Sequence, residues 1–88
     1  MARALPPGKL PAALLAEILE TLAPGPPELR LGPRPGEDAC AIDVPSGTLV
    51  VAADPITLTG HGIGTHAVLI NANDVAVTGT RPRWFLAT

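Results

Sequence analysis

The chain has 88 residues, 47% of them hydrophobic but with one Trp, one Phe and no Tyr, and its net charge is −2. This length allows one small domain with a light aliphatic core, so association with a partner is a reasonable expectation. The acidic balance provides no basic stripe for nucleic acid, and a single cysteine excludes an internal disulfide and a cysteine-rich metal site.

A short helix is predicted near the N-terminus, after a tail that contains proline and glycine. Apolar residues recur at helical spacing from Leu10 to Leu22, and Pro11 suits the first turn. Glu17 and Glu20 interrupt the apolar run and no convincing cleavage site follows, which favours an amphipathic helix over a signal peptide. No stretch is long enough to span a membrane, and we expect a cytoplasmic protein.

The next segment, 24–36, contains five prolines, and this composition predicts an extended linker with little regular structure. Two apolar runs, 39–44 and 48–54, follow and are joined by a tight Pro-Ser-Gly turn, which predicts a β-hairpin. Asp38 enters the first strand and Asp54 leaves the second. Since the start of one antiparallel strand lies beside the end of its partner, we expect these two carboxylates to be neighbours.

The longest apolar-rich run, 64–79, predicts a central helix, and spaced glycines precede it in a loop over 56–64. This helix is apolar on two sides, so it is expected to be sandwiched between layers or to await a partner. Asn71, Asp74 and Thr78 form a narrow polar stripe, and placing an amide and a carboxylate inside such a helix is costly unless they bind something. The glycine loop is typical of a phosphate-binding turn or of a flexible loop.

After a turn at Gly79, the residues RWFLAT at 83–88 predict the beginning of a further apolar strand. A chain that ends inside an element indicates a truncated protein or a fragment. The predicted fold class is α/β (α+β), with an N-terminal helix, a β-hairpin, a central buried helix and a further strand.

Oxygen-bearing side chains are the candidates for chemistry, because the sequence lacks the common nucleotide-loop, serine-hydrolase and zinc-protease motifs. His61 and His66 stand five residues apart, a poor spacing for one metal ion. Carboxylates gathered with few cationic partners suit Mg²⁺, which prefers oxygen and bridges to substrate phosphates. The alternative is that each carboxylate only ends a strand or makes a structural hydrogen bond. The candidate set comprises Asp38, Asp54, Asn71, Asn73 and Asp74.

Three segments resemble one known superfamily. GEDACAID (36–43), AADPIT (52–57) and NANDVAVTGTRPRWFLAT (71–88) are similar to the N-terminal domain of the aminoimidazole ribonucleotide (AIR) synthase superfamily. That superfamily includes the hydrogenase-maturation dehydratase, thiamine-monophosphate kinase, selenophosphate synthetase and formylglycinamidine ribonucleotide synthase. The opening PPGKLP (6–11) and the RPRWFL ending look like the synthase-related, hydrogenase-maturation-like group.

The resemblance implies an N-terminal helix and linker over 1–35, followed by an ATP-binding-type domain over 36–88 whose sheet pairs with that of a second copy in a barrel-like homodimer. ATP and Mg²⁺ would bind near the dimer interface. Cys40 stands where an alanine is common in the family, and the second domain that supplies much of the pocket is absent here, so a complete active site is not expected. The implied metal ligands are Asp38, Asp54 and Asp74, and the implied nucleotide contacts are Asn71, Asn73 and Gly79.

Two functions follow from this resemblance. The first is that of an ATP- and Mg²⁺-binding domain of an ATP-dependent synthase or maturation-type enzyme, which transfers a phosphoryl group to an oxygen or amide of an unidentified small molecule or protein tail. The second is that of a non-catalytic module of the same fold for dimerisation or partner binding, in which the acidic residues are structural.

Overall fold

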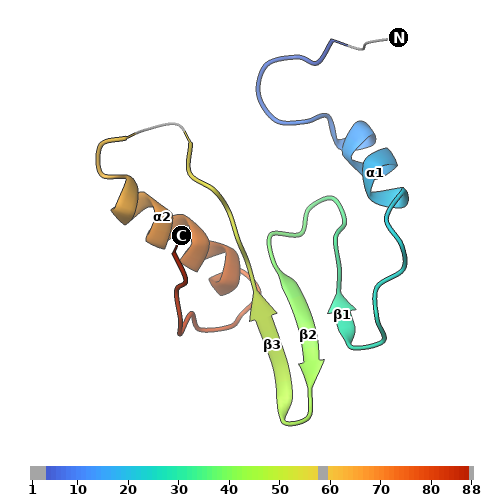
Figure 1. Cartoon of the computed structure of the whole chain (residues 1–88), viewed down its shortest axis with the longest axis vertical. Coiled ribbons are helices and arrows are strands. Elements are labelled where there is room, and N and C mark those ends of the chain that lie inside the picture. Colours follow the sequence, from blue (N-terminus) through green and yellow to red (C-terminus); the bar gives the residue numbers. More distant parts are fainter. Residues whose placement is uncertain (1–3, 58–59, 88) are drawn as a thin grey trace.

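The computed structural model describes residues 4–57 and 60–87. Those residues form two helices and one antiparallel sheet with the strand order β1-β2-β3, which confirms the α+β class. Figure 1 shows α1 standing beyond β1 and α2 beyond β3. In chain order the elements are α1 (Ala12–Glu20), β1 (Leu29–Leu31), β2 (Cys40–Val44), β3 (Gly47–Val51) and α2 (Ile63–Ala76).

Helix α1 confirms the helix predicted near the N-terminus. Pro11 occupies the N-cap with an extended ψ of 136°, and its carbonyl oxygen accepts a hydrogen bond from the Leu15 N–H at 3.0 Å. At the other end Thr21 caps the helix, with both its N–H and its hydroxyl donating to the Ile18 carbonyl. The prolines beyond Thr21 prevent a further turn, because proline has no N–H to donate.

The hairpin of β2 and β3 is confirmed, with Cys40 opposite Val51 and Val44 opposite Gly47. The prediction of a linker without regular structure over 24–36 is wrong in its middle, where β1 pairs with β2. Two features explain the strand: the alternating Leu-Arg-Leu sequence and the ion pair that Arg30 makes with Asp43 at 2.9 Å across the strands. A register shift and flanking prolines keep this edge strand three residues long.

Helix α2 confirms the second predicted helix but not its burial. No residue of α2 is buried, and Leu69 on its outer side is 55% exposed. The side turned towards the rest of the chain holds the polar stripe, with Asn71 and Asp74 both half-buried. The helix is therefore covered along one side, because no second layer of the described chain packs against the other.

The predicted strand over 83–88 is not formed in the described part, which ends at residue 87. Residues 80–87 do not pair with a strand of the described sheet, so they form no strand hydrogen bonds there. Trp84 is 74% exposed, and the Arg83 guanidinium stacks 4.3 Å from the centre of its ring. The predicted glycine loop over 56–64 also includes two residues, 58 and 59, that lie outside the described ranges.

The described residues do not enclose a hydrophobic core, since none of them is buried. The radius of gyration is 15.4 Å, whereas a compact domain of this length has a value of about 12 Å. Neither helix within 4–57 and 60–87 has the length and apolarity needed to cross a membrane. The elements are thus well formed locally, while their apolar surfaces remain largely uncovered.

Candidate functional site: an acidic corner at the strand ends

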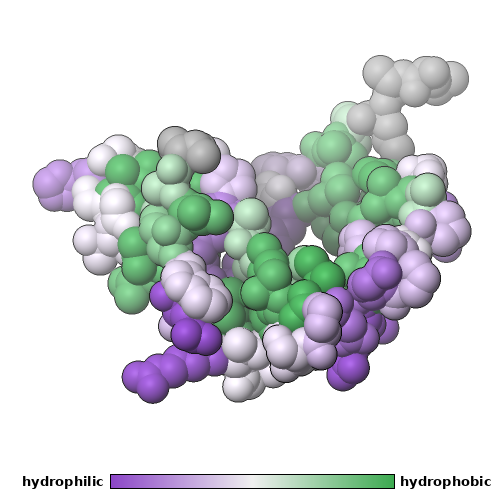
Figure 2. Space-filling model, turned by 60° about the horizontal axis from the view of Figure 1, so that its bottom comes forward, coloured by the Kyte–Doolittle hydropathy of each residue, from purple (hydrophilic) through white to green (hydrophobic). Residues whose placement is uncertain are grey.

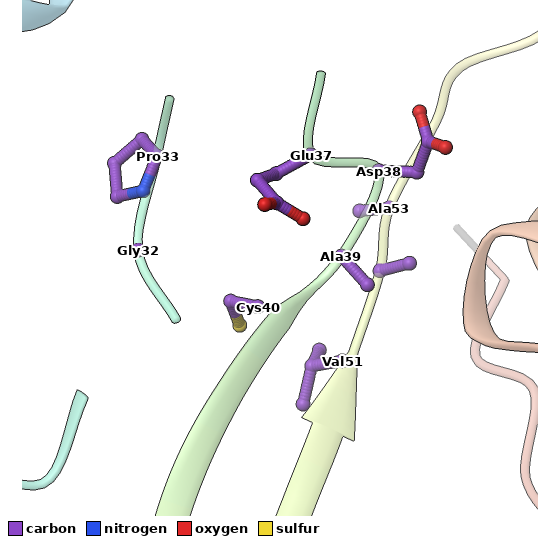
Figure 3. A pocket seen from close by; sticks show the side chains of 9 residues that line it. Gly32, Pro33, Glu37, Asp38, Ala39, Cys40, Val51 and Ala53 are labelled. Carbon is purple, nitrogen blue, oxygen red and sulfur yellow. The ribbon is translucent and has the colours of Figure 1, made fainter. Parts of the chain in front are cut away.

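Where the hairpin opens towards α2, Asp38 and Asp54 lie near enough to Asp74 for their charges to act on it, and we call Asp38, Asp54 and Asp74 the acidic corner. Strand register determines the position of Asp38. Cys40 lies opposite Val51, so in this antiparallel pair Asp38, two residues before Cys40, reaches the level of Ala53, two residues after Val51. Figure 3 shows Asp38 beside Ala53 at this position. The structure therefore places Asp38 beside the residue that precedes Asp54, and the close approach of the two carboxylates themselves stays a prediction.

Asp74 joins the corner from α2. Partial burial raises the pKa of the Asp74 carboxyl above its ordinary value, and the negative charges of Asp38 and Asp54 raise it further. None of the ion pairs among the described residues involves these three groups, since Arg30 pairs with Asp43 and Arg34 with Glu37. The corner is thus an uncompensated negative site, and a cation placed there would relieve the repulsion.

Asn71 fixes the position of α2 relative to the end of β3. Its side-chain nitrogen donates to the carbonyl oxygen of Asp54 at 3.2 Å and to that of Ala67 at 2.8 Å. One bond crosses from helix to strand end and the other lies along the helix. Because both use the amide nitrogen, the side-chain oxygen of Asn71 keeps its lone pairs for a further donor or a cation.

Asn73 and Gly79 do not lie beside Asn71, as residues that share one ligand site would. Asn73 is exposed, and two residues of helix rotate it about 200° away from Asn71. Gly79 has a φ of +89° and its N–H donates to the Ala76 carbonyl at 2.9 Å, which is the geometry of a glycine that ends a helix. The structure therefore places Asn71 at the corner, Asn73 on the other side of α2, and Gly79 at a helix stop.

The glycine-rich entry to α2 has a clear backbone role. Gly62 is the N-cap with a φ of +67°, a left-handed conformation that glycine adopts without strain. His66 lies over this turn, about 3.9 Å from where a side chain on Gly62 would begin. No side chain caps the helix there. The turn is accounted for by helix initiation, and a phosphate-binding role remains a prediction.

Sequence reasoning did not predict an open cavity of about 250 Å³ on the other side of the hairpin end, lined in part by Pro33, Glu37 and Cys40. Figure 3 shows the Glu37 side chain directed into this space, while the Asp38 carboxylate points away from it. Arg34 donates to Glu37 at 2.9 Å and holds it in place. The cavity arises because β1 and its following turn lie beside β2, a pairing that the proline-rich composition concealed.

The acidic side chains of the described residues do not form a ready-made metal centre. Within 4–57 and 60–87, no group of three or more His, Cys, Asp or Glu side chains is arranged to hold a metal ion by itself. This also means that the structure does not form a metal pair from His61 and His66 with any third ligand. The corner can attract a hydrated cation electrostatically, and water or substrate oxygens would complete the coordination of that cation.

These features define a small α+β domain in which a helix and two strand ends bring carboxylates together. The comparison with protein families identifies this class: the model for the N-terminal domain of AIR synthase related proteins matches residues 36–88. The chain therefore belongs to the AIR synthase related family, as its sequence motifs predicted. No curated protein and no solved structure matches the chain.

Proposed function

We propose that this chain binds ATP together with Mg²⁺ at the acidic corner, as the N-terminal domain of an ATP-dependent synthase or maturation-type enzyme. The single observation that carries the proposal is the electrostatic proximity of Asp38 and Asp54 to Asp74, with no ion-pair partner among the described residues, in a member of this family. Nucleotide phosphates are strongly anionic, so they require a cation or basic group to approach such a corner. Mg²⁺ meets that requirement.

The donor set fits Mg²⁺ in its chemistry. Mg²⁺ is commonly held by one or two carboxylates, with the remaining positions taken by water and substrate phosphate oxygens. The lack of a ready-made three-ligand group among the described residues is compatible with this mode, in which some of the carboxylates bind the waters of the ion. When bound, Mg²⁺ supplies charge neutralisation for the phosphates.

The chain's own residues would then have separate tasks. Asp38 and Asp54 would hold the ion from the end of the hairpin, and Asp74 would contribute its carboxylate from the helix side. Asn71 keeps the helix in register with the strand end through its bond to the Asp54 carbonyl. Transfer of a phosphoryl group depends mainly on such positioning and on charge neutralisation. The acceptor would be an oxygen or amide group of a small molecule or a protein tail.

Calorimetric titration tests the proposal directly. ATP at millimolar Mg²⁺ is expected to bind the chain, with binding weakened at least tenfold by Asp54→Asn or Asp74→Asn and abolished by chelation of Mg²⁺. Asp43→Asn is the matched control, because Asp43 is a half-buried carboxylate that pairs with Arg30 away from the corner. If ATP and ADP give no heat with the wild-type chain, or if all three variants bind equally, the proposal is wrong.

The second candidate is a non-catalytic module for homodimerisation or partner binding. It is favoured by a specific observation: no described residue is buried, so the chain has much apolar surface for a partner to cover. Under this candidate the acidic residues serve the structure alone. Asp74→Ala then destabilises the fold by roughly 1–3 kcal/mol, whereas a carboxylate kept for ligand binding is expendable for folding.

A further inference from the structure

The loop between β1 and β2 contains a turn that is closed by a backbone hydrogen bond. The Glu37 N–H donates to the Arg34 carbonyl at 3.2 Å and so joins the two ends of the turn. Pro35 and Gly36 lie between them, and Gly36 has a φ of +88°. Proline at the second position and a glycine with positive φ at the third are the features of a type II β-turn. We call residues 34–37 the proline–glycine turn.

The side chains at the two ends of this turn also contact each other. The Arg34 guanidinium donates from Nε to Oε1 of Glu37 at 2.9 Å, and its Nη2 lies 2.8 Å from the same oxygen. The Arg34 side chain is 65% exposed, and an ion pair this exposed adds little to the stability of the fold. Its effect is local: it determines where the Glu37 carboxylate points.

Glu37 and Asp38 are adjacent carboxylates that point in opposite directions. Figure 3 shows Glu37 directed into the cavity beside Cys40, and the Asp38 carboxylate pointing away from that cavity. Successive side chains of an extended backbone alternate between its two sides, so a shift of one residue would exchange the two carboxylates. The chain therefore has two candidates for one position at the acidic corner, and the local backbone selects between them.

The Asp38 side chain makes no contact that would hold it in place. Within 4–57 and 60–87 it takes part in no hydrogen bond and no ion pair. Packing does not hold it either, because none of the described residues is buried, and Figure 2 shows apolar side chains gathered around a hollow instead of filling it. The direction of Asp38 is therefore determined by the backbone on both sides of it, which is β2 after it and the proline–glycine turn before it.

We propose that the proline–glycine turn is a positioning element that directs Asp38, and not Glu37, to the acidic corner. Arg34 holds Glu37 on the opposite side and neutralises its charge, and Gly36 provides a backbone conformation that other residues adopt only with strain. Neither Arg34 nor Glu37 touches the ligand. The effect of the turn on Mg²⁺ and ATP rests on the proposed function, whereas the position of Asp38 can be measured without nucleotide.

Gly36→Ala tests the turn, and Gly8→Ala is the matched control. Both glycines have a left-handed φ, +88° and +98°, and both have open space for a side chain, but Gly8 precedes α1. Gly36→Ala should lose the nuclear Overhauser contact between Asp38 and Ala53 and should weaken Mg²⁺–ATP binding about tenfold in calorimetry. Gly8→Ala should change neither. Cross-strand contacts of the β2–β3 hairpin show in the same spectra that each variant is folded.

The ion pair is tested by removing it and by reversing it. Arg34→Ala should weaken Mg²⁺–ATP binding about two- to fivefold, a modest change because the pair is exposed. The double substitution Arg34→Glu, Glu37→Arg restores opposite charges and should return the affinity to within about twofold of the wild type. A Glu37 that itself bound the ion would give the reverse pattern: Arg34→Ala would free it and tighten binding, and the double substitution would remove the ligand.

That reverse pattern would overturn the proposal. It would also be overturned by a Gly36→Ala chain that keeps Asp38 beside Ala53 and binds Mg²⁺–ATP as Gly8→Ala does. Failure of the proposed function looks different, because the wild-type chain then gives no heat with ATP and the contact between Asp38 and Ala53 alone decides the role of the turn. Loss of this contact in Gly36→Ala and Arg34→Ala supports a positioning element, and its persistence in both refutes one.

Discussion

The half-buried sides of the two helices differ, because only that of α2 carries polar groups. α1 half-buries leucines such as Leu15 and Leu19, whereas the half-buried side of α2 includes Asn71 and Asp74. A leucine side is stabilised by burial alone, while a carboxylate requires a compensating contact. The difference favours packing through an apolar side in α1, whereas a polar contact from Asn71 ties α2 to the strand end. Substitutions in the two helices should therefore have different consequences.

The largest expected difference in stability between substitutions in the two helices comes from proline. Ala72→Pro removes a backbone bond inside α2 and should lower the free energy of unfolding by about 3 kcal/mol or more. Ala12→Pro places proline at the first position of α1, after an extended Pro11, where its fixed φ fits and little change is expected. Urea unfolding followed by helical circular dichroism measures both. Equal losses would show that α1 does not begin where the structure places it.

Glycine substitutions should have the next largest effect and should differ in sign. Gly79→Ala forces a side chain into a φ of +89° and is expected to destabilise the chain by about 1–2 kcal/mol. Gly64→Ala lies inside α2 with open space around the new methyl group, so it should stabilise by about 0.5–1 kcal/mol. Thermal or urea unfolding distinguishes them. If Gly79→Ala changed ATP affinity but not stability, the helix-stop role assigned to Gly79 would be wrong.

A smaller effect is expected from the asparagines of α2. Asn71→Ala loses the bond to the Asp54 carbonyl and should cost about 1 kcal/mol, net of the better helix propensity of alanine. Asn73→Ala, at an exposed position whose side chain makes no hydrogen bond within the described residues, should stay within about 0.5 kcal/mol of the wild type. A matched pair of urea titrations decides the point. Indistinguishable variants would mean that Asn71 does not tie α2 to the strand end.

Much of the local structure could be predicted because it depends on neighbours in sequence. Leucine spacing and flanking prolines define α1, and the apolar runs around a Pro-Ser-Gly turn define the hairpin. β1 was missed because a strand of three residues between prolines has no pattern of its own and forms through the partner that pairs with it. The strand predicted over 83–88 failed for the converse reason: its residues have strand composition, but no described strand pairs with them.

The candidate site could likewise be predicted only where it depends on neighbours in sequence. Antiparallel register was enough to predict that Asp38 and Asp54 lie at the same end of the hairpin, since that relation follows from the hairpin alone. Asp74 lies at the corner because α2 packs at the strand end, which the hairpin pattern does not predict. The polar stripe indicated this position only indirectly, since burial of such a stripe requires a partner. Sequence order made Asn71 and Asn73 look equivalent, whereas helical rotation separates them. Burial of α2 was overestimated because an apolar pattern shows which surface can be covered and not whether this chain covers it.

The smallest expected effect is a pH dependence at the acidic corner. A raised pKa means that folded Asp74 binds a proton more readily than the unfolded chain does, so its charge opposes folding. The opposition is absent below the ordinary pKa of 3.8. It develops as pH rises from there through the raised folded value, and it is fully present at neutral pH. Asp74→Asn should therefore be slightly more stable than the wild type at pH 7 and equal to it well below pH 3.8.

Asp43→Asn is the control for this comparison, because losing the pair with Arg30 should give no gain at pH 7. Millimolar Mg²⁺ sharpens the test. An ion at the corner compensates the charge of Asp74 in the wild type, so the advantage of Asp74→Asn should shrink or reverse, while the Asp43 variant should respond as the wild type does. Urea midpoints at several pH values, with and without Mg²⁺, measure the effect. A pH-independent difference that ignores Mg²⁺ would mean that Asp74 acts through packing alone, as the apolar side of α1 does.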